Sequence, residues 1–343
     1  MDALLRSLLL AVDPERAHSW ALRCLDIAAG LGWRNTTPPT VASEPVDVMG
    51  LRFRNPVGVA AGLDKNGDHI GGLAALGFGF IEVGTVTPRA QRGNDRPRLF
   101  RVPGRRAVIN RLGFNNKGVD YLVDRLAEQH SEPVIGVNIG KNRDTELARA
   151  VDDYAHAFTR VAPMADYVTV NLSSPNTPGL RALQSGDALT ELLGELKQRQ
   201  RASAADQGRY VPLVVKLAPD MTDDELVTLG RALVDAEVDG IAATNTTTDH
   251  SGVSGLRYGN EEGGVSGAPL MAPSTATLAR LRGIVGPQVP LVGVGGILGG
   301  DDARAKYRAG ADLVQVYTGL VYRGARLVRE MRMASSEARG ETP

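Results

Sequence analysis

The residues best suited to chemistry in this 343-residue chain lie in the stretch Asn171–Leu180, which reads NLSSPNTPGL. It directly follows YVTV, a β-branched run typical of a buried strand. Amides, hydroxyls and two prolines therefore stand on stiff backbone where an apolar strand ends. No G-x-S-x-G motif or His–Asp pair accompanies Ser173 or Ser174, which argues against an acyl-transfer nucleophile. A serine held against a substrate carbon could instead accept a proton, through a water or threonine relay, with activity rising with pH.

Two lysines stand in unusual surroundings for a charged side chain. Lys216 interrupts the apolar run VVKLA, and Lys65 follows another apolar run in GLDKNG. A buried ammonium is unfavourable unless an anion meets it. Lys216 could form a Schiff base, face the negative charge of a reduced flavin, or simply reach solvent with its tip. Together the two lysines favour an anionic substrate and an anionic cofactor.

Amides and glycines gather after other predicted strands. GVGG at 293–296 and YTG at 317–319 favour a phosphate site, since glycine lets backbone N–H groups approach phosphate oxygens. Five asparagines follow strands or lie in nearby loops, and an amide both donates and accepts hydrogen bonds. A ligand ring with adjacent C=O and N–H groups would suit them. They are Asn110, Asn138, Asn171, Asn176 and Asn245.

Eight short apolar runs alternate with helical patterns after about residue 46, which predicts a (β/α)8 barrel. The active site of such a barrel lies at the carboxyl ends of its strands, so the residues above would meet there. A doubly wound sheet is the fallback, but GVGGIL at 293–298 lacks the third glycine of its dinucleotide fingerprint. A hairpin is predicted for VDVMGLRF at 46–53. The eight runs begin at residues 56, 80, 134, 167, 212, 240, 290 and 313.

The first forty residues form a separate predicted unit of two short amphipathic helices. In the second helix, Asp13 fits the N-cap and Pro14 the first helical position. We therefore divide the chain into residues 1–40 and a barrel at 41–343. One face of the second helix could pack on the barrel or lie in a membrane interface, and the pattern alone favours packing because the polar face is not strongly basic. That face carries Ala17, Trp20, Ala21, Cys24, Leu25 and Ala28.

Composition argues against several functional classes. Lys+Arg and Asp+Glu both total 39, and zero net charge does not favour nucleic-acid binding. Cys24 is the only cysteine, and the five histidines show no metal-ligand spacing, so we expect no disulfide and no metal, with the histidines solvated or capping. No run reaches the ~20 apolar residues of a membrane span, and no signal peptide is expected. The strand ends also lack the carboxylate pair of a glycosidase.

Taken together, the motifs resemble those of the class 2, quinone-dependent dihydroorotate dehydrogenases over nearly the whole chain. They are DPERAH, AAGLDKNG, EVGTVTP, RLFRVPGRRAVINRLGFNN, GVNIGKN, NLSSPNTPGLR, KLAPD, ATNTT, GGVSGAPL, GVGGI and VYTG. Class 1 enzymes carry cysteine where Ser174 stands, so the serine supports class 2. The resemblance implies an FMN-binding (β/α)8 barrel that oxidises (S)-dihydroorotate to orotate in pyrimidine biosynthesis and reduces a membrane quinone.

The resemblance also implies roles for individual residues. Ser174 would remove a proton from C5 of dihydroorotate while hydride leaves C6 for the flavin, and Lys216 would offset the charge of reduced flavin. Quinone would enter near His18 and Arg101, with residues 1–40 docking a monomer on the cytoplasmic face of the membrane. FMN would contact Ala61, Gly62, Leu63, Asp64, Lys65, Thr85, Asn138, Asn171, Lys216, Thr244, Gly267, Gly296, Tyr317 and Thr318. Dihydroorotate would contact Lys65, Asn110, Arg111, Leu112, Gly113, Phe114, Asn171, Asn176, Asn245 and Thr246.

Three other functions fit parts of the pattern. A dihydrouridine-synthase-like flavin barrel is the nearest, but zero net charge and the lack of a basic RNA-binding domain weigh against it. A lyase or isomerase with a Schiff base on Lys216 would be colourless when purified. A membrane-surface binding protein with an inactive barrel would bind liposomes without turnover, and the intact set of Lys65, Ser174 and Lys216 argues against it. The loop 250–262 is less distinctive, so the sequence does not establish it as a lid.

Overall fold

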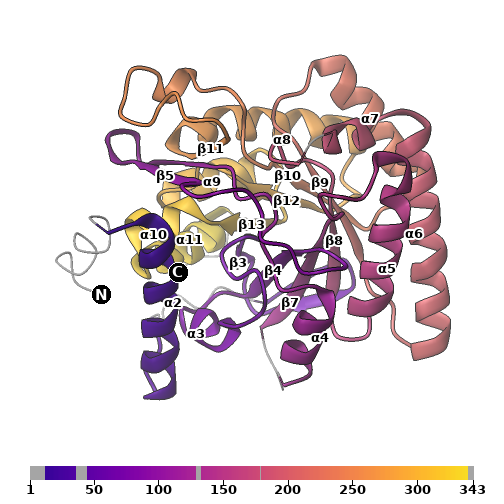
Figure 1. The fold of residues 1–343 in the computed structure, drawn as a ribbon, viewed down its shortest axis with the longest axis horizontal. Coiled ribbons are helices and arrows are strands. Elements are labelled where there is room, and N and C mark those ends of the chain that lie inside the picture. Colours follow the sequence, from indigo (N-terminus) through magenta and orange to yellow (C-terminus); the bar gives the residue numbers. More distant parts are fainter. Residues whose placement is uncertain (1–11, 36–44, 129–132, 178, 339–343) are drawn as a thin grey trace.

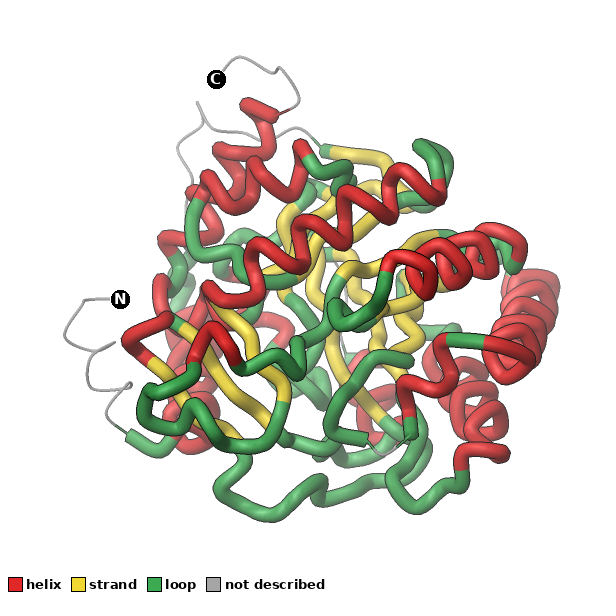
Figure 2. Tube along the Cα trace, turned by 90° about the horizontal axis from the view of Figure 1, so that it is seen from above, coloured by secondary structure: helices red, strands yellow, loops and turns green. Residues whose placement is uncertain are grey.

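The computed structural model describes residues 12–35, 45–128, 133–177 and 179–338. The first predicted helix, most of the NTTPPT linker, the proposed division at residue 40 and Pro178 lie outside these ranges. Eight parallel strands close into a barrel, and helices surround it on the outside (Figures 1 and 2). The predicted (β/α)8 barrel is therefore confirmed.

The barrel strands are the eight predicted apolar runs. Nearly all their residues are buried, because parallel barrel strands face side chains on the inside and helices on the outside. The last strand pairs with the first, Val316 beside Val59, and this pairing closes the barrel. The strands are β3 (Val57–Val59), β4 (Phe80–Val86), β7 (Val134–Ile139), β8 (Tyr167–Asn171), β9 (Leu213–Leu217), β10 (Gly240–Ala243), β12 (Leu291–Val294) and β13 (Leu313–Val316).

A helix lies between each pair of consecutive barrel strands, and local sequence explains where such a helix begins. In α7, the Thr222 hydroxyl accepts from the N–H of Glu225, and the Glu225 carboxylate accepts from the N–H of Thr222, which forms a capping box. Leucines 226, 229 and 233 then face the core at helical spacing. The helices between barrel strands are α3 (Ile70–Ala75), α4 (Val119–Ala127), α5 (Ala150–Val161), α6 (Gly186–Gln207), α7 (Asp223–Asp235), α8 (Met271–Val285) and α9 (Gly300–Arg308). Two more, α10 (Thr318–Arg323) and α11 (Arg326–Ala338), follow the last barrel strand.

Aromatic rings fill the amino-terminal end of the barrel. The Phe80 ring lies 5.3 Å from the Phe53 ring and 6.4 Å from the Tyr167 ring, centroid to centroid, in edge-to-face contact. Glycines on the neighbouring strands leave room for these rings, because a Cβ at Gly58 would lie 2.4 Å from Phe80 and one at Gly136 would lie 2.1 Å from Tyr167. Phe53 comes from the predicted hairpin, which is confirmed as β1 (Val46–Val48) and β2 (Leu51–Phe53).

A small antiparallel sheet, which we did not predict from sequence, lies outside the barrel. It comprises β5 (Leu99–Val102), β6 (Ala107–Asn110) and β11 (Gly264–Gly267), in the order β11-β6-β5. The sequence PGRR at 103–106 between two short apolar runs is a turn signal, and it could have identified the β5–β6 hairpin. The third strand comes from a distant loop, so local pattern could not have revealed its pairing.

Helix α2 (Pro14–Gly30) begins as predicted, with the Asp13 carboxylate accepting from the N–H of Arg16 at 2.9 Å. It runs beside α3 at the edge of the molecule (Figure 1). No described helix is long and apolar enough to cross a bilayer.

The predicted packing face of α2 is confirmed only in part, since Ala17 is buried and Leu25 packs against the hydrophobic core. Ala17 and Leu22 are the buried residues of this helix, whereas the side of Trp20 and Cys24 is exposed. Polar contacts help to set the orientation of the helix, because two carboxylates on it reach polar side chains of the barrel. Glu15 pairs with the buried Arg98 at 2.6 Å, and Asp26 lies 2.5 Å from the ring of His69.

Phe80→Ala should lower the free energy of unfolding by about 3–5 kcal/mol, because the barrel end cannot collapse into the space left by the ring. Chemical denaturation followed by fluorescence or circular dichroism measures this. Met164→Ala, at a residue 44% exposed, is the control and should change the free energy of unfolding by about 0.5 kcal/mol or less. Equal losses for the two variants would contradict the packing described here.

Candidate active site

A cavity of about 1040 Å³, counting its open mouth, lies at the carboxyl ends of the barrel strands. It brings together most of the residues expected from sequence, including the serine, both lysines and four of the five asparagines. The predicted residues on its wall are Ala61, Gly62, Lys65, Thr85, Asn110, Leu112, Gly113, Phe114, Asn171, Ser174, Asn176, Lys216, Thr244, Asn245, Thr246, Gly267, Gly296, Tyr317 and Thr318.

Leu63 and Asp64 are not among the residues that line the cavity. Leu63 packs in the hydrophobic core. The Asp64 carboxylate accepts from the backbone N–H groups of Asn66, Asp68 and His69 at 3.3, 3.1 and 2.7 Å, which shapes the loop that carries Lys65. Burial raises the pKa of Asp64 in spite of these bonds. Asp64 therefore acts on the cavity through backbone shape.

Arg111 also points elsewhere than expected. Its guanidinium donates to the Glu261 carboxylate and to the Pro97 carbonyl, both at 2.9 Å, and lies over the Phe100 ring. These contacts tie β6 to the loop 250–262. In the same loop, the two ring nitrogens of His250 lie 2.9 Å from the carbonyl oxygens of Gly259 and Gly263, so this half-buried ring joins two parts of the loop and makes no side-chain cap bond.

A directed chain of side-chain hydrogen bonds runs from the barrel interior to the cavity wall. The Glu82 carboxylate accepts from Asn138 Nδ2 at 2.8 Å, and Asn138 Oδ1 accepts from Thr85 Oγ1 at 2.5 Å and from Asn171 Nδ2 at 3.2 Å. Asn171 Oδ1 in turn accepts from Asn245 Nδ2 at 3.2 Å. Because the Glu82 carboxylate accepts from Asn138 Nδ2, the Asn138 amide oxygen faces the other way, and this fixes the direction of the amides that follow. Asn138 thus lies one layer behind the wall and orients the residues on it.

Glu82 is a functional residue that the sequence analysis missed. It is buried within β4 and also accepts from Tyr167, Thr169 and Gln315. A glutamate inside the apolar run FIEVGTV is a detectable signal, because a buried carboxylate needs several donors. Two further wall residues, Ser266 and Gln315, were not predicted as site residues, although Ser266 lies in the motif GGVSGAPL beside the predicted Gly267.

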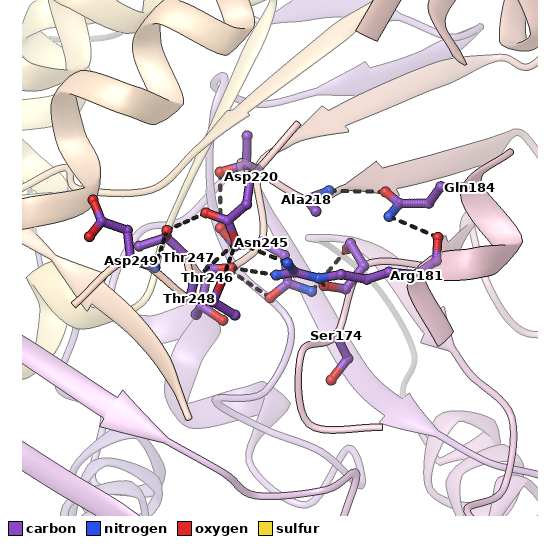
Figure 3. A network of polar contacts seen from close by, with 12 residues as sticks. Ser174, Arg181, Gln184, Ala218, Asp220, Asn245, Thr246, Thr247, Thr248 and Asp249 are labelled. Atoms are coloured by element: carbon purple, nitrogen blue, oxygen red, sulfur yellow. Dashed lines mark hydrogen bonds and ion pairs between the residues drawn. The ribbon is translucent and has the colours of Figure 1, made fainter. Parts of the chain in front are cut away.

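Ser174 lies on the cavity wall with 5% of its surface exposed (Figure 3). Its Oγ accepts from the N–H of Asn176 at 3.3 Å. Asn176 donates through Nδ2 to Asn110 Oδ1 at 3.2 Å, which joins the serine loop to β6. In the described part of the chain, Ser174 Oγ bonds to no acceptor, so its lone pairs and its proton are available to a ligand.

Both lysines on the wall are desolvated. Burial lowers the pKa of Lys216, while the charge of Glu82 acts in the opposite direction. Burial lowers the pKa of Lys65 to about 8, and its Nζ donates to the Gly62 carbonyl at 2.9 Å. Lys216 Nζ has no hydrogen-bond partner among the described residues. Two poorly solvated ammonium groups favour anionic ligands in this cavity.

The glycine segments form a cradle that side chains would fill. Gly296 has φ +82°, and a Cβ there would lie 2.3 Å from Cα of Met271, the first residue of α8. A Cβ at Gly319 would lie 2.1 Å from the carbonyl oxygen of Ile297. Only glycine therefore fits at either position. Both glycines line the cavity, and backbone without side chains beside the start of α8 favours phosphate.

His18 and Arg101 lie on the α2 side of the barrel and are not part of the cavity wall. His18 hydrogen-bonds with the backbone of Leu63, next to the loop of Lys65. Burial lowers the pKa of His18 to about 3, and the positive charge of Lys65 acts in the same direction. Arg101 donates to the carbonyl of Val12 at the start of the described chain.

Comparison with known proteins agrees with this geometry. The model of a family described as dihydroorotate dehydrogenase matches residues 44–334. The chain belongs to the dihydroorotate dehydrogenase family. It is 53% identical over 343 residues to the dihydroorotate dehydrogenase (quinone) of Azotobacter vinelandii, covering 100% of this chain and 99% of that one. The corresponding protein of Pseudomonas aeruginosa is 53% identical over 330 residues, with 96% of each chain covered.

Solved structures of the family share the fold. Dihydroorotate dehydrogenase of Eimeria tenella in complex with ferulenol superimposes with a TM-score of 0.85 at 37% identity, covering 93% of this chain and 90% of that one. The ligand-free form from the same organism gives a TM-score of 0.84 at 38% identity, with 93% of each chain covered. The fold of this chain is thus the fold of these solved structures.

Proposed function

We propose that the protein oxidises (S)-dihydroorotate to orotate, a step of pyrimidine biosynthesis, and passes the electrons to a membrane quinone. The observation that carries this proposal is the convergence of Ser174, Lys65 and the directed amides on one cavity. Membership of the dihydroorotate dehydrogenase family supports the reaction, and the names of the relatives support quinone as acceptor. The Schiff-base and dihydrouridine-synthase-like alternatives have no comparable support.

FMN is the cofactor that we propose for the deep part of the cavity. When bound, FMN accepts a hydride from the substrate and later releases two electrons to quinone. The glycine cradle of Gly296 and Gly319 suits its phosphate. Lys216 supplies a buried positive charge with no competing hydrogen-bond partner among the described residues. Ser266 and Thr318, whose hydroxyls lie 2.8 Å apart on the wall, add polar contacts beside the cradle.

The mouth of the cavity suits the pyrimidine. Asn110, Asn176 and Asn245 present both donors and acceptors, which complement the alternating C=O and N–H groups of dihydroorotate. Lys65 is the cation available for the substrate carboxylate. With the ring held by these groups, Ser174 Oγ accepts the C5 proton. Because a serine hydroxyl is a weak base, its own proton must leave through a relay, and the rate should rise with pH.

An apolar surface on α2 supports membrane docking. Trp20, Ile27 and Leu31 are 51%, 65% and 84% exposed, on or directly after a helix whose other side packs on the barrel. We propose that this surface lies in the membrane interface at the cytoplasmic face. We propose that quinone approaches past His18, which bonds to the backbone of Leu63, and Arg101, which bonds to the carbonyl of Val12.

Ser174→Ala should keep bound FMN but slow flavin reduction by dihydroorotate by about 10²–10⁴-fold, because the C5 proton loses its acceptor. Anaerobic stopped-flow absorbance measures the rate. Ser173→Ala is the matched control, since the Ser173 hydroxyl bonds to Asn171 and Asn245 and should affect substrate affinity more than the limiting rate. A near-normal limiting rate in Ser174→Ala would remove Ser174 as the base.

Orotate should bind more weakly as pH rises above about 8, by up to about tenfold per pH unit. Burial favours the neutral form of Lys65, whereas a bound carboxylate favours the ammonium, so binding takes up a proton above its pKa of about 8. Titration of the flavin absorbance with orotate between pH 6 and 9 measures this. Lys65→Met, checked first for flavin content, should bind weakly with little pH dependence, and an unchanged dependence would assign it to another group.

Trp20→Gln combined with Ile27→Gln should weaken binding to phosphatidylcholine–phosphatidylglycerol vesicles by at least about tenfold, because each side chain loses about 1.5–3 kcal/mol of apolar burial. Turnover with a long-chain quinone in those vesicles should fall, while flavin reduction by dihydroorotate stays normal. Ser19→Gln, at an exposed position of the same helix, is the control. Unchanged vesicle binding would refute the docking surface.

A further inference from the structure

Arg181 links the carboxyl ends of three neighbouring barrel strands although it does not line the cavity (Figure 3). Its Nη1 donates to Asp220 Oδ2, beyond β9, at 3.0 Å. Its Nε donates to the Ser173 carbonyl, beyond β8, and its Nη2 to the Thr246 carbonyl, beyond β10, both at 3.4 Å. One side chain therefore contacts the serine loop and the strand end that carries Asn245.

Asp220 holds this guanidinium in place. Its carboxylate also accepts from the Thr247 hydroxyl, from the Thr248 N–H at 2.9 Å and from the Thr248 hydroxyl at 3.1 Å. These four donors fix the carboxylate between the ends of β9 and β10. The Arg181 and Asp220 side chains are 28% and 23% exposed, so solvent screens the pair only in part.

The geometry requires arginine at this position. A guanidinium is a planar fork with five N–H donors, and here all three nitrogen atoms donate in different directions. A lysine has one nitrogen on a flexible chain and cannot serve three well-separated acceptors together. The 3-10 helix η4 (Leu180–Gln184) sets the position of Arg181, because Gln184 on the same turn accepts from the N–H of Ala218 at 3.1 Å.

We propose that Arg181, held by Asp220, is a positioning residue that sets the Ser174 hydroxyl against C5 of dihydroorotate. The carbonyl of Ser173 belongs to the peptide group that joins it to Ser174. The Thr246 carbonyl belongs to the residue after Asn245, and the Thr246 N–H donates to Asn245 Oδ1 at 2.8 Å. The guanidinium thus fixes the distance between the proton acceptor and the group that holds the substrate. Small displacements of a reacting group reduce the rate strongly, so this distance governs proton removal. The inference rests on the proposed role of Ser174.

Arg181→Met in the FMN-loaded full chain tests this inference. The limiting rate of flavin reduction at saturating dihydroorotate should fall at least tenfold, while the dissociation constant of orotate changes less than threefold. Arg181→Lys keeps the cation beside Asp220 and should recover part of the rate. Arg209→Met is the matched control, because Arg209 likewise caps two carbonyls and pairs with an aspartate, but lies at the amino-terminal end of the barrel. It should reduce the flavin at the normal rate.

The outcomes separate this inference from the role of Ser174. A normal limiting rate in Arg181→Met, with a slow Ser174→Ala, overturns the positioning role and leaves the base intact. Normal limiting rates in both Arg181→Met and Ser174→Ala would show that Ser174 is not the base. The positioning role of Arg181 would then be wrong as well. If Arg181→Met loses limiting rate and orotate affinity to the same extent, Arg181 supports the whole site and does not specifically position Ser174, which overturns the proposal. If Arg181→Met does not fold or retain flavin, Arg181→Lys decides, since a wild-type limiting rate in that variant overturns the proposal.

Discussion

The Glu82 carboxylate, buried in the middle of the barrel, accepts hydrogen bonds from Asn138, Tyr167, Thr169 and Gln315. A charge in such surroundings is tolerable only when donors surround it, and the low local dielectric then makes each of those bonds strong. Since the carboxylate cannot donate, it imposes a direction on Asn138, which transmits it to the amides on the cavity wall. The amides on the cavity wall are thus oriented by Glu82, which does not line the cavity itself.

The closed end of the barrel makes this arrangement effective. The rings of Phe53, Phe80 and Tyr167 fill the amino-terminal end, and Gly58 and Gly136 give them room. The polar chain thus lies between this aromatic packing and the cavity at the carboxyl ends. Desolvation lowers the pKa of the wall lysines and prepares them for anions.

Two carboxylates divide the positioning of the site between them. Glu82, inside the barrel, orients amides whose partners are all buried. Asp220, outside, holds Arg181 and through it the loops that follow β8 and β10. The hydrogen bonds of Glu82 determine which donor and acceptor groups face a ligand. The Asp220–Arg181 pair determines how far Ser174 lies from those groups. Helix α2 adds a third polar attachment through Glu15 and Asp26, which leaves its apolar side free to face a membrane.

The sequence by itself determined the barrel and the membership of the site. Apolar runs of strand length identified all eight strands, and parallel strands must end at one face, so Ser174, Lys216 and the glycine segments had to meet there. What only the tertiary structure decided was the direction of side chains. Arg111 turns to Glu261, Asp64 binds its own loop, and Trp20 faces outward. The spacing of residues along the chain shows which side of a helix or strand is apolar. Which residues that side contacts is decided by packing between segments that are far apart in sequence.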